Sequence, residues 1–308
     1  MSMNTIGRSR QDRIFDTLNF AFVAVVTFVI LYPLLFVLSA SVSDPNMVNG
    51  GKVWLWPREV TFEAYKYVLQ ESKVWRAYVN TVLYVAVDIG VSLAVILPLA
   101  YSLSRPNRMK GAGIITFLVA FTMLFSGGII PNYLVVKQMG WINTVWSLTV
   151  PVAVSPYLVI ITRTFFSTSL PKDLYDAAEI DGASFAQTFF RLVVPLSTAI
   201  IAVVTLFKGV AQWNNFFRPL IFLTEEEKYP LQLVLRQILL ENQTIAGGSS
   251  DAMDLMSEEA LAEVFRRTQL AETMKYALII VASAPVLMLY PFLQKHLMKG
   301  IMLGAVKG

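Results

Sequence analysis

The sequence predicts an all-α membrane protein with six transmembrane helices and both termini in the cytoplasm. Hydrophobic residues make up 56% of the chain and charged residues only 15%, whereas a soluble globular protein carries about a quarter charged residues. Apolar segments recur along the chain, and most are close to the roughly 20 residues that a helix needs to cross a bilayer. Basic residues gather beside the shorter loops, which indicates the orientation.

Six apolar segments are the candidate spans: 15–38, 78–103, 111–130, 146–166, 196–212 and 276–292. The first could be mistaken for a signal peptide, because Ser39-Ala40-Ser41 follows it. Its apolar run of about 24 residues is well beyond the 7–15 of a signal peptide, which favours an uncleaved anchor. Residues 1–14 are then an N-terminal cytoplasmic segment, and 15–308 form one transmembrane domain.

The orientation follows from basic residues that flank the short loops. With six spans these residues all fall on one side: Arg8, Arg10, Arg13, Arg105, Arg108, Lys110, Lys295, Lys299 and Lys307. The segment 167–195 is then cytoplasmic, and two long loops, 39–77 and 214–275, lie outside. The second of them holds the small residues Gly247, Gly248 and Ser249, followed by an amphipathic helix that begins after Ser257.

Composition excludes several kinds of site. The chain has no cysteine and a single histidine, His296, so disulfides, thiolate zinc sites and histidine-rich metal sites cannot form. No GxxxxGK[ST] phosphate loop occurs, and the chain therefore cannot hold ATP by that route. The net charge of +4 reflects basic flanks of the spans rather than nucleic-acid binding.

The polar stretch from Pro171 to Pro195, called the 171–195 loop below, predicts a helix–glycine–helix unit. Pro171 fits an early helical position, and Gly182 interrupts the pattern. Ser184-x-x-Gln187 is a capping box that begins the second helix, and Pro195 ends it at the membrane. Phe185, Phe189 and Leu192 share one face of that second helix. The first helix is expected to expose Leu174 and Ala178 for packing, together with the carboxylates of Asp173, Asp176, Glu179 and Asp181.

The loop resembles the EAA loop of bacterial binding-protein-dependent ABC importers, in which Glu-Ala-Ala, Gly and Ile-x-Leu-Pro stand at fixed spacing. Here those places hold Asp176-Ala177-Ala178, Gly182, Leu192, Val194 and Pro195. The departures keep the charge or the apolar character. The resemblance implies a coupling helix that docks on an ATPase subunit, through Asp176, Ala177, Ala178, Glu179, Asp181, Gly182, Ala183 and Pro195. The alternative is an ordinary solvated polar face.

Two further stretches, 213–223 and 300–308, look like the carbohydrate-importer permeases related to the smaller maltose-type membrane subunit, and 125–134 resembles the branch for complex saccharides. This likeness implies a type I ABC importer permease in the bacterial cell membrane, not an enzyme. It implies a heterodimer with a second permease, two ATPase subunits and an extracytoplasmic solute-binding protein. It also implies no cofactor in this chain, since ATP and Mg would be bound by the ATPase.

Candidate solute contacts are less specific. Asp88 and Lys208 are charges within spans, where they are costly. We expect them to pair with each other or with a second permease rather than to contact the solute. Amide and aromatic groups that suit a sugar occur at Gln212, Trp213, Asn214 and Asn215, although Trp at a boundary is also an interfacial anchor. By position, the resemblance implies that Gly247, Gly248 and Ser249 touch the binding protein; the alternative is a flexible linker. The rival function is a stand-alone secondary transporter or channel, which would leave the 171–195 loop unexplained.

Overall fold

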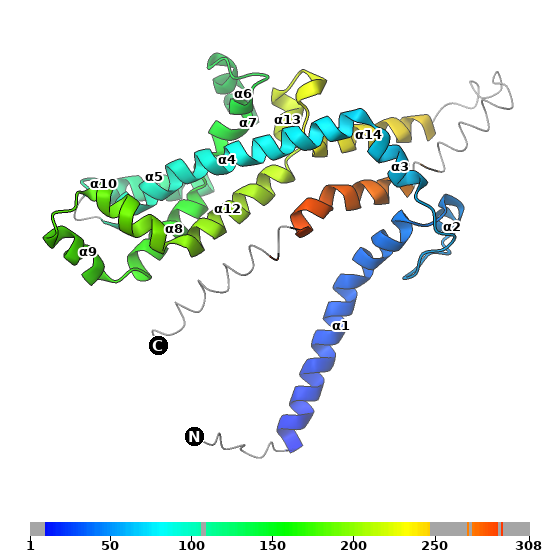
Figure 1. The fold of residues 1–308 in the computed structure, drawn as a ribbon, viewed down its shortest axis with the longest axis horizontal. Coiled ribbons are helices and arrows are strands. Elements are labelled where there is room, and N and C mark those ends of the chain that lie inside the picture. The colour runs from blue at the N-terminus through cyan, green and yellow to red at the C-terminus, as the bar shows by residue number, and fades with distance from the viewer. Residues whose placement is uncertain (1–9, 106–108, 247–269, 271–272, 289–290, 292–308) are drawn as a thin grey trace. The chain divides into compact units, whose positions relative to one another are not determined.

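The structure is a computed structural model that describes residues 10–105, 109–246, 270, 273–288 and 291. Within these residues the chain is helical, apart from one isolated bridge between Ser43 and Val60 (Figure 1). The all-α prediction is therefore confirmed. The chain packs as two units, Met1–Glu71 with Ile238–Ala282, and Ser72–Gln237 with Ser283–Gly308.

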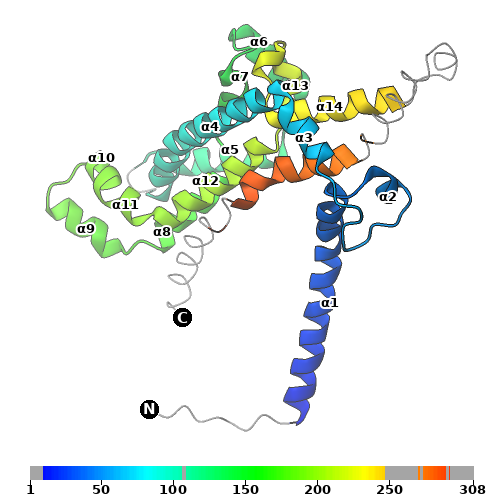
Figure 2. The same ribbon diagram turned by 45° about the vertical axis from the view of Figure 1, so that its right-hand side comes forward.

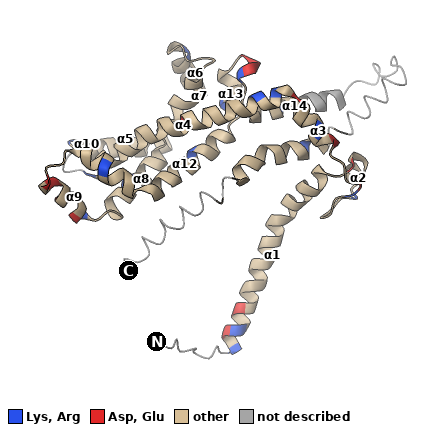
Figure 3. Cartoon of the chain, in the orientation of Figure 1, with Lys and Arg blue, Asp and Glu red and all other residues tan. Residues whose placement is uncertain are grey.

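In the first unit, α1 (Arg10–Ser41) is the longest helix and contains the predicted first span. Its charged residues all lie near its beginning, and the rest of the helix is uncharged (Figure 3). Pro33 lies inside the helix, and the apolar side chains along its length are exposed. A long helix with an exposed apolar surface has the composition of a membrane span.

The end of α1 is held by hydrogen bonds to the segment that follows it. Ser39 Oγ donates to the Leu55 carbonyl at 2.6 Å, and Tyr65 Oη donates to Ser41 Oγ at 2.8 Å. Two short helices follow, α2 (Pro45–Asn49), which the Asp44 side chain caps, and α3 (Glu63–Gln70). Small residues at the end of α1 thus allow close packing of this connection.

The second unit is built around α4 (Ser72–Ser104), which contains the second predicted span. It packs against α8 (Pro156–Thr168) and α12 (Thr198–Trp213), and α5 (Ala112–Leu124) packs against α8 (Figures 1 and 2). Three residues from different helices, Ile96, Val159 and Val204, are fully or almost fully buried at this contact. The central position of α4 matters for the site described below.

Two of the predicted spans contain a bend, and a third bend lies just before the fifth predicted span. The axes of α5 and α6 (Ile129–Gln138) differ by 119°, and the expectation of one straight helix over 111–130 is wrong. The reason is local: Gly127 and Gly128 follow α5, and Gly128 has a φ of +80°, which only glycine adopts without strain. Hydropathy shows that a segment is apolar but not that it turns.

The other two bends are associated with prolines. Residues Val145–Val152 comprise α7 (Val145–Thr149) and the 3₁₀ turn η1 (Val150–Val152), and they meet α8 at 53°. Residues Phe185–Leu196 meet α12 at 78°. Proline lacks the N–H that continues the helical hydrogen bonds, so breaks at Pro151, Pro156 and Pro195 are expected.

Further helices lie in the stretch predicted as a long loop, 214–275. They are α13 (Phe217–Phe222), the short turn η3 (Glu226–Lys228) and α14 (Leu231–Ala246). A shorter apolar helix, Thr273–Met288, overlaps the sixth predicted span. Among the described residues, two helices are long and apolar enough to cross a membrane, or up to five if each bent pair is one span.

Candidate functional site

The 171–195 loop folds as the predicted helix–glycine–helix unit. The first helix, α9 (Lys172–Ile180), follows Pro171, which occupies the cap position. Gly182 has a φ of +73°; its N–H donates to Glu179 O at 3.0 Å, and the Ala183 N–H donates to Ala178 O at 2.9 Å. These two bonds are the glycine-dependent ending of a helix known as the Schellman motif. Gly182 therefore fixes the direction of the turn.

The second helix begins with the predicted capping box. In α10 (Phe185–Thr188), the Ser184 N–H donates to Gln187 Oε1 at 2.8 Å and the Gln187 N–H donates to Ser184 Oγ at 3.3 Å. The helix then widens into a π-helical turn, η2 (Phe189–Val193), and continues as α11 (Val194–Leu196). Pro195 thus lies inside α11, which ends at Leu196, one residue later than predicted. The missing proline N–H interrupts the regular bonding here.

The two faces of α9 differ from the prediction. Ala178 was expected to be exposed for packing on a partner, and this is wrong: Ala178 is buried together with Tyr175. These two residues are three apart and share the helix face that packs inside the chain. The exposed residues are instead Lys172, Asp173, Asp176, Ala177, Glu179, Ile180, Asp181 and Gly182, while Leu174 and Ala183 are half-buried.

Ile180 is the functional candidate that the sequence analysis missed. Its side chain is 87% exposed, the most exposed of the large hydrophobic residues described. Ile180 follows Asp176 and Ala177 at helical spacing. The exposed face of α9 therefore carries an apolar group as well as carboxylates. That spacing was visible in the sequence, but the burial of Tyr175, which fixes the face, was not.

The buried side of the loop belongs to the core of the second unit. Tyr175 and Phe189 pack there with Tyr101 of α4 and Phe166 of α8. Burial raises the pKa of Tyr175, and a hydrogen bond and the charge of Arg105 act in the opposite direction. A cavity of about 110 Å³ lies beside them, lined by Tyr101, Arg105, Tyr175, Asp176, Glu179, Ala183, Phe185 and Thr188.

The two charges predicted within spans form an ion pair. Lys208 Nζ lies 3.1 Å from Asp88 Oδ2, and both side chains are at least nine-tenths buried. The same ammonium donates to the Val152 carbonyl at 2.8 Å, beside the bend between η1 and α8. The predicted pairing is confirmed, and Lys208 joins α12, α4 and the α7–α8 bend through one cation.

The four candidate sugar-contact residues lie at the end of α12. Gln212 and Trp213 are buried, and the Trp213 ring packs edge-on against Tyr78 with centroids 6.0 Å apart. Asn215 Nδ2 donates to Gln212 Oε1 at 3.4 Å, while Asn214 is exposed and bonds the Val210 carbonyl at 3.0 Å. The amide groups are therefore gathered together, and the Trp213 ring is covered by the chain itself.

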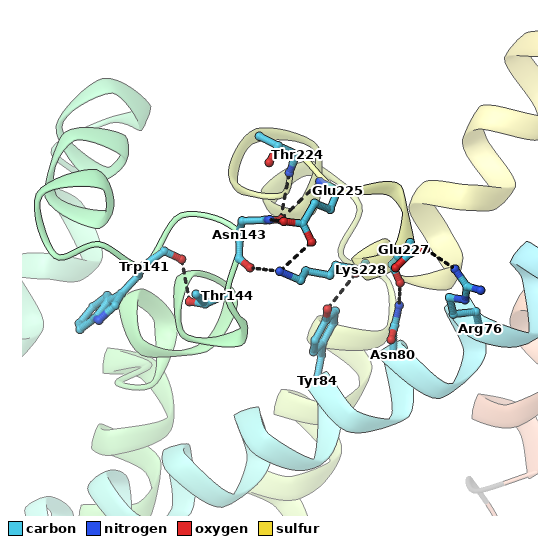
Figure 4. Close-up of polar contacts among 10 residues, drawn as sticks. All are labelled: Arg76, Asn80, Tyr84, Trp141, Asn143, Thr144, Thr224, Glu225, Glu227 and Lys228. Carbon is cyan, nitrogen blue, oxygen red and sulfur yellow. Dashed lines mark hydrogen bonds and ion pairs between the residues drawn. The ribbon is translucent and has the colours of Figure 1, made fainter.

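A second polar cluster, which the sequence analysis did not find, surrounds Asn143 (Figure 4). Asn143 has a φ of +62°. Its side-chain nitrogen donates to the Glu225 carboxylate, and its side-chain oxygen accepts from the N–H groups of Thr224 and Glu225 at 3.3 and 3.4 Å. Lys228 Nζ donates to the Asn143 carbonyl at 3.1 Å and lies 2.9 Å from Glu225 Oε2. We call these four residues the Asn143 clasp.

The segment that holds the clasp is tied to α4 (Figure 4). Tyr84 Oη donates to the Lys228 carbonyl at 2.8 Å, and Asn80 Nδ2 donates to the carbonyl of Glu227 at 2.7 Å. Arg76 lies 3.3 Å from Glu227 in an exposed ion pair. The clasp therefore joins two loops that are far apart in the sequence and connects both to the beginning of α4.

Replacement of Asn143 by alanine is expected to loosen residues 223–230. Alanine removes three side-chain hydrogen bonds, and it tolerates a positive φ less well than asparagine. We expect faster amide hydrogen exchange in 223–230, whereas Asn143→Gly, which keeps the backbone conformation, should show the smaller increase. Unchanged exchange in Asn143→Ala would contradict the role of the clasp.

The clasp should also weaken in acid. The hydrogen bond from Lys228 lowers the pKa of Glu225. A group whose folded-state pKa is depressed adds stability above its unfolded pKa and loses it as pH falls through the folded pKa. The protection of the 223–230 amides, taken relative to the intrinsic exchange rate at each pH, should therefore fall below about pH 4, and Glu225→Gln should remove this dependence. A dependence that persists in Glu225→Gln would assign it to another group.

Three predicted features lie outside the described residues. They are the binding-protein contact Gly247, Gly248 and Ser249, the amphipathic helix after Ser257, and the stretch 300–308 that resembles carbohydrate-importer permeases. They stay predictions.

The described residues thus form an all-helical, apolar domain that carries a polar, capped helical loop. No family model matches the chain. Protein LplC of Bacillus subtilis (strain 168) is 35% identical over 307 residues, which cover 99% of this chain and 99% of that protein. The polygalacturonan/rhamnogalacturonan transport system permease protein YtcP of the same organism is 35% identical over 298 residues, 97% of this chain and all of that protein.

A solved structure agrees with these relatives. A chain in the crystal structure of a bacterial ABC transporter involved in the import of the acidic polysaccharide alginate has a TM-score of 0.80 at 32% identity, and the match covers 93% of this chain and 98% of that one. This chain belongs to the family of ABC sugar-transport permeases. It is an integral membrane transport component rather than an enzyme, and it works with other components of an ABC importer. The stand-alone transporter is not favoured.

Proposed function

We propose that this chain is the permease subunit of an ATP-driven importer of oligosaccharides or polysaccharide fragments, coupled to a separate ATPase through the 171–195 loop. The observation that carries the coupling proposal is the geometry of that loop. It is a rigid unit with a Schellman turn at Gly182 and a capping box at Ser184. A rigid element transmits displacement, whereas a flexible loop absorbs it.

The proposed topology has six spans, with the termini and the segment 167–195 in the cytoplasm and the loops 39–77 and 214–275 outside. The clustered basic residues at the beginning of α1 support this orientation. In this topology each of the bent pairs α5–α6 and α7–α8 is one span. The shorter apolar helix Thr273–Met288 is a large part of another. In this arrangement α9 projects into the cytoplasm, and the Asn143 clasp faces outward.

The substrate proposal rests on the relatives. One has a name that refers to polygalacturonan and rhamnogalacturonan, and the similar solved transporter is involved in alginate import. Such polymers carry carboxylates as well as hydroxyl groups. Amide side chains can bind either group, and Gln212, Asn214 and Asn215 are the proposed contacts, with Trp213 as their support.

The proposed assembly contains a second permease in a heterodimer, two ATPase subunits that bind ATP and Mg, and an extracytoplasmic binding protein. The exposed α9 residues Asp176, Ala177, Glu179 and Ile180, with Asp181, Gly182 and Ala183, would contact the ATPase, and Pro195 would set the angle to α12. The binding protein would touch Gly247, Gly248 and Ser249.

The test is copurification with the ATPase, together with uptake, for Gly182→Asp and Gly182→Asn. A Cβ atom at Gly182 would meet no atom within 4 Å. The substitutions therefore act through backbone strain at the positive φ and, for aspartate, through the added charge. Asparagine tolerates that φ and has nearly the same size as aspartate. We expect Gly182→Asp to insert normally but to lose most uptake, and Gly182→Asn to retain clearly more. Normal ATPase binding and uptake in Gly182→Asp would refute the coupling role.

A further inference from the structure

The 171–195 loop is continuous in sequence with α8 and α12, but its aromatic rings meet α4. Tyr101, near the end of α4, stacks on Phe185 with ring centroids 4.5 Å apart and planes inclined by 29°. It also contacts Phe189 at 5.2 Å and Tyr175 at 6.4 Å. One ring of α4 thus touches both helices of the loop.

A cation closes the same contact. Arg105 directly follows α4, and its guanidinium carbon lies 3.1 Å from the centroid of the Tyr175 ring. A guanidinium over a tyrosine face is a favourable cation–π arrangement. The Tyr175 hydroxyl also donates to the Phe166 carbonyl of α8 at 3.4 Å. Tyr175 is therefore held from α4 and α8 together.

These contacts form a packed junction rather than isolated surface pairs. Tyr101, Tyr175 and Phe189 are all buried, and they share one cluster with Leu97 and Ala100 of α4. Close-packed interiors transmit displacement because they have few voids to absorb it. A movement of α9 would be passed to α4 through ring faces, in addition to any movement passed along the backbone to α8 and α12.

Helix α4 extends from this junction toward the Asn143 clasp. The same helix carries Asp88, whose partner Lys208 lies on α12. Nearer its beginning, Tyr84 bonds the clasp residue Lys228 and Asn80 bonds the neighbouring Glu227. The junction and the clasp therefore lie near opposite ends of one unbroken helix. A displacement at the 171–195 loop has a direct mechanical route to the far side of the second unit.

We propose that Tyr101, Tyr175 and Phe185, with Arg105, form an aromatic joint that stays closed through the transport cycle and carries the movement of the 171–195 loop into α4. The residues of the joint position the coupling unit; they do not touch the solute. The proposal rests on the proposed function, because it needs an ATPase that moves the loop.

The test uses the absence of cysteine from the chain. In the reconstituted importer, Tyr101→Cys with Phe185→Cys removes the stacked pair and places two thiols within reach of a short bismaleimide. Without the cross-linker, we expect the ATPase to copurify normally while uptake falls by about tenfold, a size typical of residues that couple two sites. With the cross-link, we expect uptake to recover to at least about half that of the unmodified importer.

Each other outcome overturns the proposal. Normal uptake without the cross-link means that the joint is not needed. No recovery, or a block, after cross-linking means that it does not stay closed. Loss of the ATPase from the uncross-linked complex means that the rings hold the docking site instead of transmitting its movement.

A second pair of variants distinguishes the contact made by Arg105 from the general effect of losing a positive charge in this turn. Arg105→Gln should lower uptake by about threefold, while Lys110→Gln, an exposed lysine in the same turn, should not change it. Equal effects of the two substitutions would contradict a role for the cation–π contact. If the wild-type importer neither binds an ATPase nor takes up saccharide, the proposed function fails; if it does both and all variants behave like it, only the joint fails.

Discussion

Replacement of Lys208 by methionine is expected to prevent the permease from accumulating as a folded protein. Methionine has a similar length but no charge, so the Asp88 carboxylate would stay buried without its partner and the Val152 carbonyl would lose its donor. Removing one member of a buried ion pair costs about 3–5 kcal/mol, a large share of a typical folding free energy. The amount of monodisperse protein after detergent extraction, and its thermal midpoint, measure the loss.

Two matched variants identify the cause. The double variant Asp88→Asn with Lys208→Met removes both charges and is expected to recover much of the lost protein, because no uncompensated charge stays buried. Lys137→Met removes a lysine that is exposed near the end of α6 and should behave like the wild type. A double variant as unstable as Lys208→Met alone would show that the ammonium is needed for the Val152 contact rather than for Asp88.

The second large effect is expected at Ile180. An isolated apolar side chain with 87% exposure beside carboxylates suits a partner surface that has both an apolar pocket and basic groups. We expect Ile180→Asp to lower uptake by at least about tenfold, the cost of losing a central interface contact. The ATPase should no longer copurify, although the quantity of permease in the membrane should not change.

The control for Ile180→Asp adds the same charge elsewhere in the loop. Ala186 is exposed in the first turn of α10, where an aspartate is favourable. Ala186→Asp should therefore leave both uptake and ATPase binding nearly intact. Equal losses in the two variants would mean that the loop as a whole does not tolerate a new charge, and that Ile180 has no particular role.

Features that depend on local chemistry could be predicted from the sequence. Gly182 and the Ser184–Gln187 box are short-range signals, because a positive φ and a cap involve neighbouring residues only. The pairing of Asp88 with Lys208 followed from a different rule, the cost of an isolated charge in a bilayer. In each case the residues have few other partners or conformations available to them.

The sequence did not predict which face of a helix is buried or in which direction the chain turns. A helix of nine residues offers two overlapping faces, and placing Ala178 outside with Leu174 was wrong because Tyr175, not Leu174, defines the buried face. The stack of Arg105 on Tyr175 joins residues that are distant in sequence and whose types are common at any surface. The 119° turn after α5 needed the backbone conformation of Gly128, which hydropathy does not record.

The Asn143 clasp was missed for a related reason. Asn143, Glu225 and Lys228 are ordinary polar residues of two separate loops, and neither loop alone contains a recognisable motif. Only the positive φ of Asn143 distinguishes it, and asparagine is among the residues that adopt such a conformation most readily. An Asn-containing turn at this place was the one available signal.

The buried lysine also bears on how the chain enters the membrane during synthesis. A lysine at the centre of an inserting helix raises the cost of leaving the translocon by about 2.5–3.5 kcal/mol. Asp88 is made long before Lys208, and it too is unfavourable alone in lipid. The order of synthesis therefore favours keeping α4 beside the translocon until α12 arrives, so that the two charges enter lipid as a neutral pair. Assembly of this unit would be completed during insertion rather than after it.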